Sequence, residues 1–122
     1  MDSKTPAVEL GATRQRHRRS KLLAYTIFAT IKYDSREDRR KVLPSFITHR
    51  DRCLAGEPGT IQFDISLPND DDTTIMLYEV YDNEAAFQAH SKGESMQKLR
   101  AELEALGVKP SARTVVHGTI AE

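Results

Sequence analysis

The sequence predicts an α+β domain whose four antiparallel strands carry helices on one face only. Three observations support this prediction. Residues 22–33 and 73–81 are apolar on both faces of an extended chain, which is typical of central strands. Residues 61–67 alternate between apolar and polar side chains, as a less covered edge strand does. A helical segment follows the first strand and another follows the third, so the order β-α-β-β-α-β matches a ferredoxin-like sheet.

The strands differ in the side chains that they place on each face. In the first strand one face holds Ile27, Ala29 and Ile31, and the other holds Thr26, Phe28 and Thr30. The acidic turn at residues 68–72 joins the second and third strands, so these two are expected to form a hairpin. A last short strand is expected at residues 114–120.

Both helices have recognisable ends. Ser35 can cap the first helix, and Gly56 is expected to end it. The apolar stripe of this helix follows helical spacing through Leu43, Phe46, Ile47, Arg50 and Leu54. The second helix is expected to begin near Asn83, to break near residues 91–93, and to end at Gly107.

Two helices can cover only one face of such a sheet. The other face would then expose on the order of several hundred Å² of apolar surface, which monomers usually avoid. We therefore expect a twofold homodimer in which two sheets pack face to face.

The 122-residue chain is expected to form one folded domain, residues 22–122, preceded by a basic and flexible arm, residues 1–21. Residues 1–22 hold six basic and two acidic side chains, whereas the whole chain has a formal net charge of zero. The body of the protein is therefore acidic, which is atypical of a nucleic-acid-binding protein, so no nucleic-acid partner is expected.

The sequence also indicates a cytosolic location. It contains no apolar run of the roughly 18 residues that a membrane-spanning helix needs, so no membrane partner is expected. No apolar signal-peptide segment follows the basic start. Cys53 is the only cysteine, so no intrachain disulfide can form.

Residues 77–90, LYEVYDNEAAFQAH, carry the strongest resemblance to a known family. Together with YTIFATIK at residues 25–32 and the EPG turn before the second strand, they resemble the antibiotic biosynthesis monooxygenases, which include quinol monooxygenase-like proteins. The resemblance covers about residues 24–120. It implies a dimeric α+β barrel with a pocket between sheet and helices in each subunit. Many relatives have a second histidine five residues after the position of His90, where this chain has Ser95.

Three residues are candidates for catalysis. The resemblance implies that His90 accepts a proton from a phenolic or enolic substrate, and the alternative is a structural histidine bonded to the sheet. His49 lies beside the apolar stripe, where it faces the same pocket or the helix rim. Glu79 stands in an apolar strand, so it is either a base with a raised pKa or one partner of an ion pair.

The residues expected to hold an aromatic substrate are Arg50, Phe63, Tyr78 and Phe87, with Phe28 and Met76 as further cavity residues. The alternative is that Arg50 pairs with Glu79 or Asp82 and that the apolar residues belong to the core. No metal site is predicted, because the four histidines contain no His-x-x-x-His pair. Cys53 has no activating neighbour in the sequence and is predicted to be inert.

Two classes of function fit these observations. The first is a monooxygenase that needs no bound cofactor and acts on a phenolic or quinol-type small aromatic molecule, because an electron-rich phenolate can itself donate electrons to dioxygen. The second is a non-catalytic ligand-binding or stress-response module with the same fold. An isomerase of small molecules is a weaker alternative, which Ser95 opposes.

Overall fold

The computed structural model describes residues 23–121, and the predicted arm at residues 1–21 lies outside them. The chain forms β1 (Tyr25–Lys32), α2 (Arg36–Gly56), β2 (Thr60–Ser66), β3 (Thr74–Tyr81), α3 (Glu84–Lys92), α4 (Glu94–Leu106) and β4 (Ala112–Thr119). The predicted β-α-β-β-α-β order is confirmed, with the second helix divided into two. Within the described residues, no helix is both long enough and apolar enough to cross a membrane.

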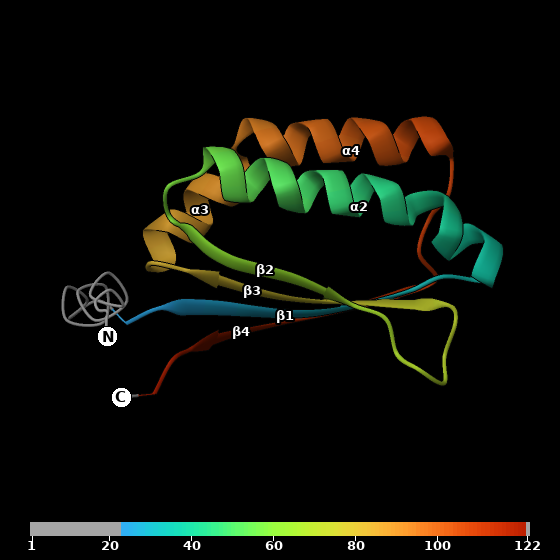
Figure 1. Cartoon of the computed structure of the whole chain (residues 1–122), viewed down its shortest axis with the longest axis horizontal. Helices are drawn as coiled ribbons and strands as arrows, with labels where there is room; N and C mark the ends of the chain where they lie inside the picture. The colour runs from blue at the N-terminus through green and yellow to red at the C-terminus, as the bar shows by residue number, and fades with distance from the viewer. Residues whose placement is uncertain (1–22, 122) are drawn as a thin grey trace, which may run out of the picture.

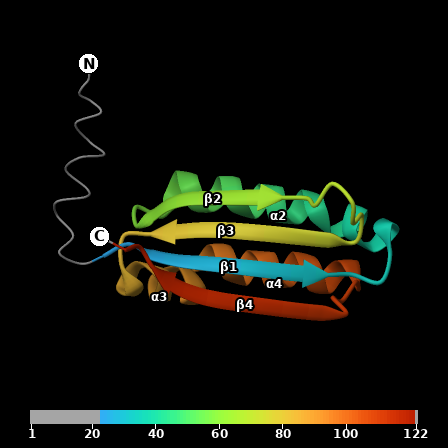
Figure 2. The same ribbon diagram turned by 90° about the horizontal axis from the view of Figure 1, so that it is seen from below.

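The four strands form one antiparallel sheet in the order β2-β3-β1-β4 (Figure 2). The central places of β1 and β3 and the edge place of β2 are as predicted. The register sets Ile27 of β1 opposite Glu79 of β3, and Glu79 opposite Phe63 of β2. Because side chains in directly opposed positions share a face, these three point together toward the helices.

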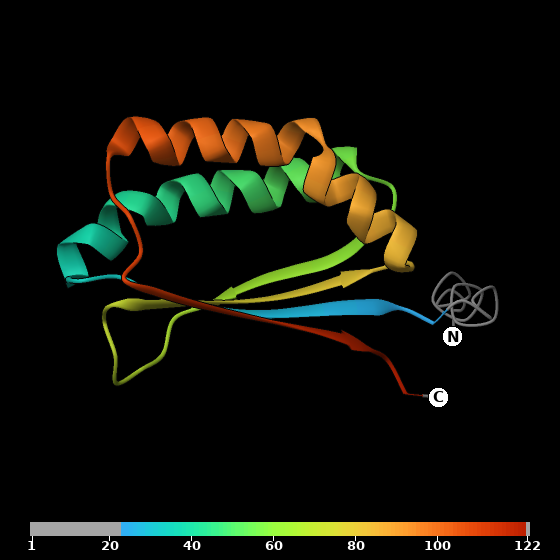
Figure 3. The ribbon, with the colours of Figure 1, turned by 180° about the vertical axis from the view of Figure 1, so that it is seen from behind.

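All three helices cover the same face of the sheet (Figures 1 and 3). Helices α2 and α4 lie side by side, and α3 packs near one end of the sheet. The core between the layers includes fully buried Val42 and Ile75, together with Phe46 and Leu99. Burial of these side chains supplies the main apolar contribution to folding, at about 1.5–3 kcal/mol for each large one.

The ends of the helices follow the predicted signals. Ser35 Oγ accepts a hydrogen bond from Asp38 N at 3.1 Å at the start of α2. Asn83 Oδ1 accepts from Ala86 N at 2.9 Å at the start of α3. Gly107 ends α4 in the left-handed region, with φ of 71°, where a residue without Cβ meets no steric penalty.

Within residues 23–121, no helix covers the opposite face of the sheet (Figure 2). Phe28, Met76 and Val116 are 53%, 42% and 54% exposed on it. The Phe28 ring lies 4.7 Å from that of Tyr78, centroid to centroid. This exposed apolar group is the surface through which the chain was expected to dimerise, and the dimer itself stays a prediction.

Candidate functional site

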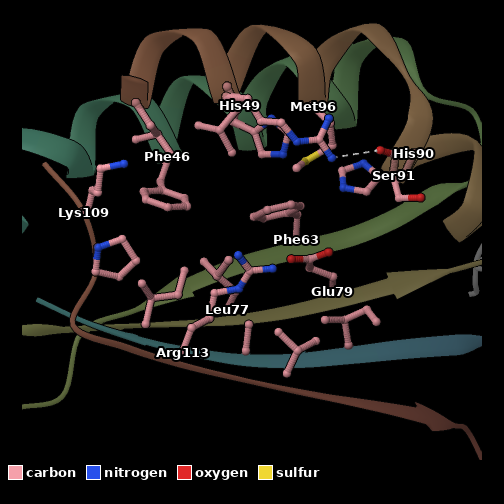
Figure 4. A pocket seen from close by; sticks show the side chains of 18 of the residues that line it. Phe46, His49, Phe63, Leu77, Glu79, His90, Ser91, Met96, Lys109 and Arg113 are labelled. Atoms are coloured by element: carbon pink, nitrogen blue, oxygen red, sulfur yellow. Dashed lines mark hydrogen bonds between the residues drawn. The ribbon is translucent and has the colours of Figure 1, made fainter. Parts of the chain in front are cut away.

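A cavity of about 570 Å³ lies between the inner face of the sheet and the helices. Its floor is apolar and includes Ile27, Ala29 and Leu77, and Phe46 and Leu99 enclose it from the helices. Figure 4 shows His49 and His90 reaching in from the helical side and Phe63 and Glu79 from the sheet. A cavity of this size, with a largely apolar lining and a few polar side chains, suits a small organic molecule.

His90 is held in place by Glu57. Its Nδ1 lies 2.9 Å from Glu57 Oε1, and Thr60 Oγ1 donates to the same oxygen at 2.7 Å. Burial raises the pKa of Glu57, but the hydrogen bonds from His90 and Thr60 outweigh it and leave the pKa below its ordinary value. Because an ionised carboxylate can only accept, Nδ1 carries the proton in neutral His90 and Nε2 keeps the lone pair.

Local structure brings this pair together from residues 33 positions apart in sequence. Glu57 follows the last turn of α2, where its N–H donates to Cys53 O at 2.9 Å. Asp82 N donates to Gly59 O at 2.9 Å, which ties the turn after α2 to the corner before α3. The absence of a side chain at Gly59 lets the turn approach Ala86, because a Cβ there would lie 2.6 Å from Ala86 Cβ.

His49 and Cys53 lie one turn apart on α2, beside His90. Cys53 Sγ is 3.5 Å from His49 Nε2 and 3.7 Å from His90 Nδ1. Burial, assisted by the charges of His90 and Arg52, lowers the pKa of His49 to about 4. Burial and the nearby Glu57 carboxylate raise the pKa of Cys53 to about 12. Near neutral pH the imidazole of His49 is therefore uncharged, and the thiol of Cys53 is protonated.

Glu79 is buried and forms part of the cavity wall. Tyr81 Oη donates to Glu79 Oε1 at 2.5 Å. Burial raises the pKa of Glu79 more than this hydrogen bond lowers it. Burial also raises the pKa of Tyr81, so the phenol stays protonated and acts as the donor.

The structure separates the predicted substrate-binding residues. Phe63 and Phe87 line the cavity. Tyr78 faces the opposite side of the sheet, because it is adjacent to inward-facing Glu79 and neighbouring side chains on a strand alternate. Arg50 does not line the cavity, and its Nε donates to Asp51 Oδ1 at 2.8 Å. Arg50 thus pairs with its neighbour Asp51, and the suggested pairing with Asp82 stays a prediction.

Phe28 and Met76, which were expected to contribute to the cavity, are also exposed on the outer face. The alternation that places Ile27 and Leu77 inward turns these two outward. The predicted substrate-binding set thus mixed residues from both faces of the sheet.

Sequence reasoning missed Glu57 and Thr60, because the EPG turn was interpreted only as a connection between helix and strand and as part of the family resemblance. It also missed the cluster of His49, Cys53 and His90. The available signal was the four-residue spacing of His49 and Cys53, which places two side chains on one helical face. Buried Ser95 completes the surroundings: burial raises the pKa of Cys53 and Ser95 only partly opposes this rise, whereas for Glu57 it assists His90 and Thr60 in lowering the pKa.

Comparison with solved structures shows the same fold in several bacterial proteins. A candidate antibiotic biosynthesis monooxygenase from Caulobacter crescentus is 15% identical, with a TM-score of 0.74 over 87% of this chain and 99% of that one. One from Nitrosomonas europaea is 20% identical, with a TM-score of 0.67 over 79% and 88% of the two chains. A Mycobacterium tuberculosis protein is 14% identical, with a TM-score of 0.68 over 81% and 96%.

These identities are low, so the structures support the fold alone. Among curated proteins, no sequence matches the chain. The family assignment comes instead from the sequence model described as antibiotic biosynthesis monooxygenase, which matches residues 26–102. That match includes β1 except its first residue, both site-bearing helices α2 and α3, and the hairpin between them. The chain therefore belongs to the antibiotic biosynthesis monooxygenase family.

Proposed function

We propose that this protein is a monooxygenase that oxidises a phenolic or quinol-type small aromatic molecule without a bound cofactor. The observation that carries the proposal is the position of His90. Its imidazole lies in the wall of an apolar cavity, and Glu57 fixes its tautomer from the other side. A neutral imidazole with one oriented lone pair is suited to accept a phenolic proton.

The first step is proton transfer from the substrate hydroxyl to His90 Nε2. The Glu57 carboxylate stabilises the imidazolium that forms, because it already accepts the hydrogen bond from Nδ1. The substrate is left as a phenolate in surroundings that include Phe63 and Leu77. These apolar side chains limit the contact of the ring with water, which favours its reaction with dioxygen.

In the second step the phenolate donates electrons to dioxygen, and a carbon–oxygen bond forms between the ring and a peroxide. The oxygen–oxygen bond then breaks, one oxygen atom stays on the ring as a carbonyl, and the other leaves as water. A phenol and O₂ thus give a quinone and water, with all electrons supplied by the substrate. The imidazolium of His90 returns its proton to the departing oxygen.

Two further cavity residues have supporting roles in this proposal. Glu79 has a raised pKa, so it can hold or release a proton near the developing oxygen anion. His49 is uncharged over most of the pH range and offers a hydrogen bond without changing the charge of the cavity. The ring of the substrate would pack against Phe63 and Phe87.

The test is oxygen uptake with a panel of phenols and hydroquinones. We expect turnover by the unmodified protein and a loss of about 10²–10⁴-fold in His90→Gln, the usual contribution of a positioned acid–base group. Glu57→Gln should also lose activity, because the amide no longer fixes the tautomer. His117→Gln is the matched control, since His117 lies on β4 and bonds to Tyr25 Oη at 2.7 Å, outside the cavity.

The second candidate function is a ligand-binding module without turnover. It is supported by the same pair of His90 and Glu57, which can hold a ligand hydroxyl without removing its proton. Tight binding of phenols with no oxygen uptake by the unmodified protein would favour this function and contradict the monooxygenase. A cytoplasmic location and a homodimer built on the exposed sheet face are also part of the proposal.

A further inference from the structure

We propose that His49, Cys53, His90 and Glu57 form a binding site for one zinc-like divalent cation. The first three side chains are 2%, 0% and 5% exposed. Their ligand atoms all lie within 4.8 Å of one another. Figure 4 shows His49 and His90 reaching toward each other from two different helices. Buried nitrogen and sulfur ligands that converge from separate elements can enclose an ion that a single helix could not.

The spacing of these atoms is close to that of a tetrahedral zinc site. Zn–S bonds of about 2.3 Å and Zn–N bonds of about 2.0–2.1 Å place sulfur and nitrogen ligands roughly 3.5 Å apart. Cys53 Sγ lies 3.5 Å from His49 Nε2 and 3.7 Å from His90 Nδ1. Binding would therefore change the distances from Cys53 Sγ to the two imidazole nitrogens only slightly.

Glu57 supplies the fourth ligand once its carboxylate turns toward the ion, because it is not one of the three side chains whose ligand atoms already lie within 4.8 Å of one another. Its Oε1 lies 2.9 Å from His90 Nδ1, and the same nitrogen atom also faces the thiol of Cys53. At present a proton joins Nδ1 and Oε1, and the cation would take the place of that proton. Two tetrahedral ligands of this kind lie about 3.3 Å apart, so the pair would open by a few tenths of an ångström.

The charges of the site also suit a divalent cation. The ordinary pKa of a thiol falls strongly on zinc binding, so Cys53 would bind as a thiolate. One thiolate and the Glu57 carboxylate balance the two charges of the ion, which avoids an uncompensated charge in a buried place. The proton that the cation displaces from His90 Nδ1 would move to Nε2, and the thiol of Cys53 would lose its proton. One proton is therefore released for each ion bound.

The mixture of ligands selects the class of metal. Imidazole and thiolate favour zinc and its spectroscopic substitute Co²⁺, whereas Mg²⁺ and Ca²⁺ require oxygen ligands. The ion has a route to the site, because His49 and His90 both line the cavity.

Metal binding and the proposed proton transfer exclude each other at any one moment. A cation on Nδ1 leaves a proton on Nε2, so His90 no longer has a lone pair for a substrate. Zinc would therefore inhibit oxygen uptake. The metal site does not depend on the monooxygenase proposal, because it is measured by spectroscopy and stands whether or not the protein consumes oxygen.

The experiment is a titration of chelator-treated protein with Co²⁺. We expect a near-ultraviolet thiolate-to-cobalt band, intense visible bands of tetrahedral cobalt, saturation at one ion per chain and displacement by Zn²⁺. The release of one proton per ion is a second readout. A chelator of known affinity, added in competition, gives the dissociation constant.

Variants then assign the ligands. Cys53→Ser should lose the near-ultraviolet band, and His49→Gln should lower the affinity for Zn²⁺ by more than about 100-fold. Glu57→Gln should lower it at least about 10–100-fold, the usual cost of losing even an outer carboxylate partner. His117→Gln is the matched control and should bind as the unmodified protein does.

Cobalt spectra of the unmodified protein alone can overturn the proposal, so the test does not require that any variant folds. Absence of the thiolate band at saturating Co²⁺, or octahedral cobalt spectra, would contradict the site. A band that persists in Cys53→Ser would also contradict it. A thermal midpoint that rises with Zn²⁺ in the unmodified protein and in His117→Gln, but not in His49→Gln, would support it.

Discussion

The contact between Gly59 and Ala86 joins the turn that carries Glu57 to the helix that carries His90, and it can be tested by substitution. A Cβ at Gly59 would lie 2.6 Å from Ala86 Cβ. Carbon atoms normally approach to about 3.5–4.0 Å, so Gly59→Ala must move the turn or α3 by about 1 Å. Overpacking of this kind costs about 1–3 kcal/mol, which corresponds to a fall in thermal midpoint of about 5–15 °C.

A double-mutant cycle isolates the contact. In Gly59→Ala with Ala86→Gly, the nearest remaining atom to the new Cβ is the residue 86 Cα at 3.6 Å, an ordinary contact distance. Ala86→Gly alone should cost about 0.5–1 kcal/mol, because it places glycine in a helix. The double variant should therefore be more stable than the sum of the two single effects predicts, by about 1–3 kcal/mol.

The assay is urea unfolding followed by circular dichroism, with Gly56→Ala as the matched control. A Cβ at Gly56 meets nothing within 4 Å, so this variant should keep or slightly raise the free energy of unfolding. Additive single effects, or equal destabilisation by Gly59→Ala and Gly56→Ala, would refute the reasoning.

Three other predictions test the burial of polar groups and the exposed sheet face. The pKa of His49 falls from 6.5 to about 4 on folding, so its contribution to the free energy of unfolding is complete above pH 6.5 and is lost as the pH falls toward 4. In chelator-treated protein, urea unfolding should show that the free energy of unfolding falls by up to about 3 kcal/mol across this range. In His49→Gln this pH-dependent fall should be smaller. Tyr81→Phe removes the donor to Glu79 and should lower the free energy of unfolding by about 1–3 kcal/mol, with a higher pKa for Glu79 by carboxyl-resolved NMR. Light scattering should give about twice 13.8 kDa for the unmodified protein and a monomer for Phe28→Glu, and a monomeric unmodified protein would contradict the dimer.

The fold was largely predictable, because its signals are local. Alternation in 61–67 identified the edge strand, and apolar residues on both faces of residues 73–81 identified a central one. Asn83 capped its helix as expected, and Gly93 marked the break between α3 and α4. Each of these features depends on residues within a few positions of one another, so a single sequence contains the information.

The site was only partly predictable, because its partners come from distant segments. The motif around His90 and the apolar positions of Phe63 and Phe87 were sufficient to place these residues near a cavity. The partnership of His90 with Glu57 depends on how α3 packs against the turn after α2, and no local pattern encodes that contact. Tyr78 was misplaced for a different reason: strict alternation with Glu79 already excluded it from the same cavity.

The central claim is that His90 removes a proton from a phenol bound in the cavity. The most direct measurement uses a nitrophenol, whose phenolate absorbs visible light and whose ionisation falls near neutral pH. The protein is titrated with it without turnover, at a pH where the free compound is mostly neutral. We expect the phenolate band to appear on binding to the unmodified protein and to His117→Gln, and we expect His90→Gln to bind the neutral phenol. A bound phenol that stays neutral in the unmodified protein, or that ionises equally in His90→Gln, would contradict the claim.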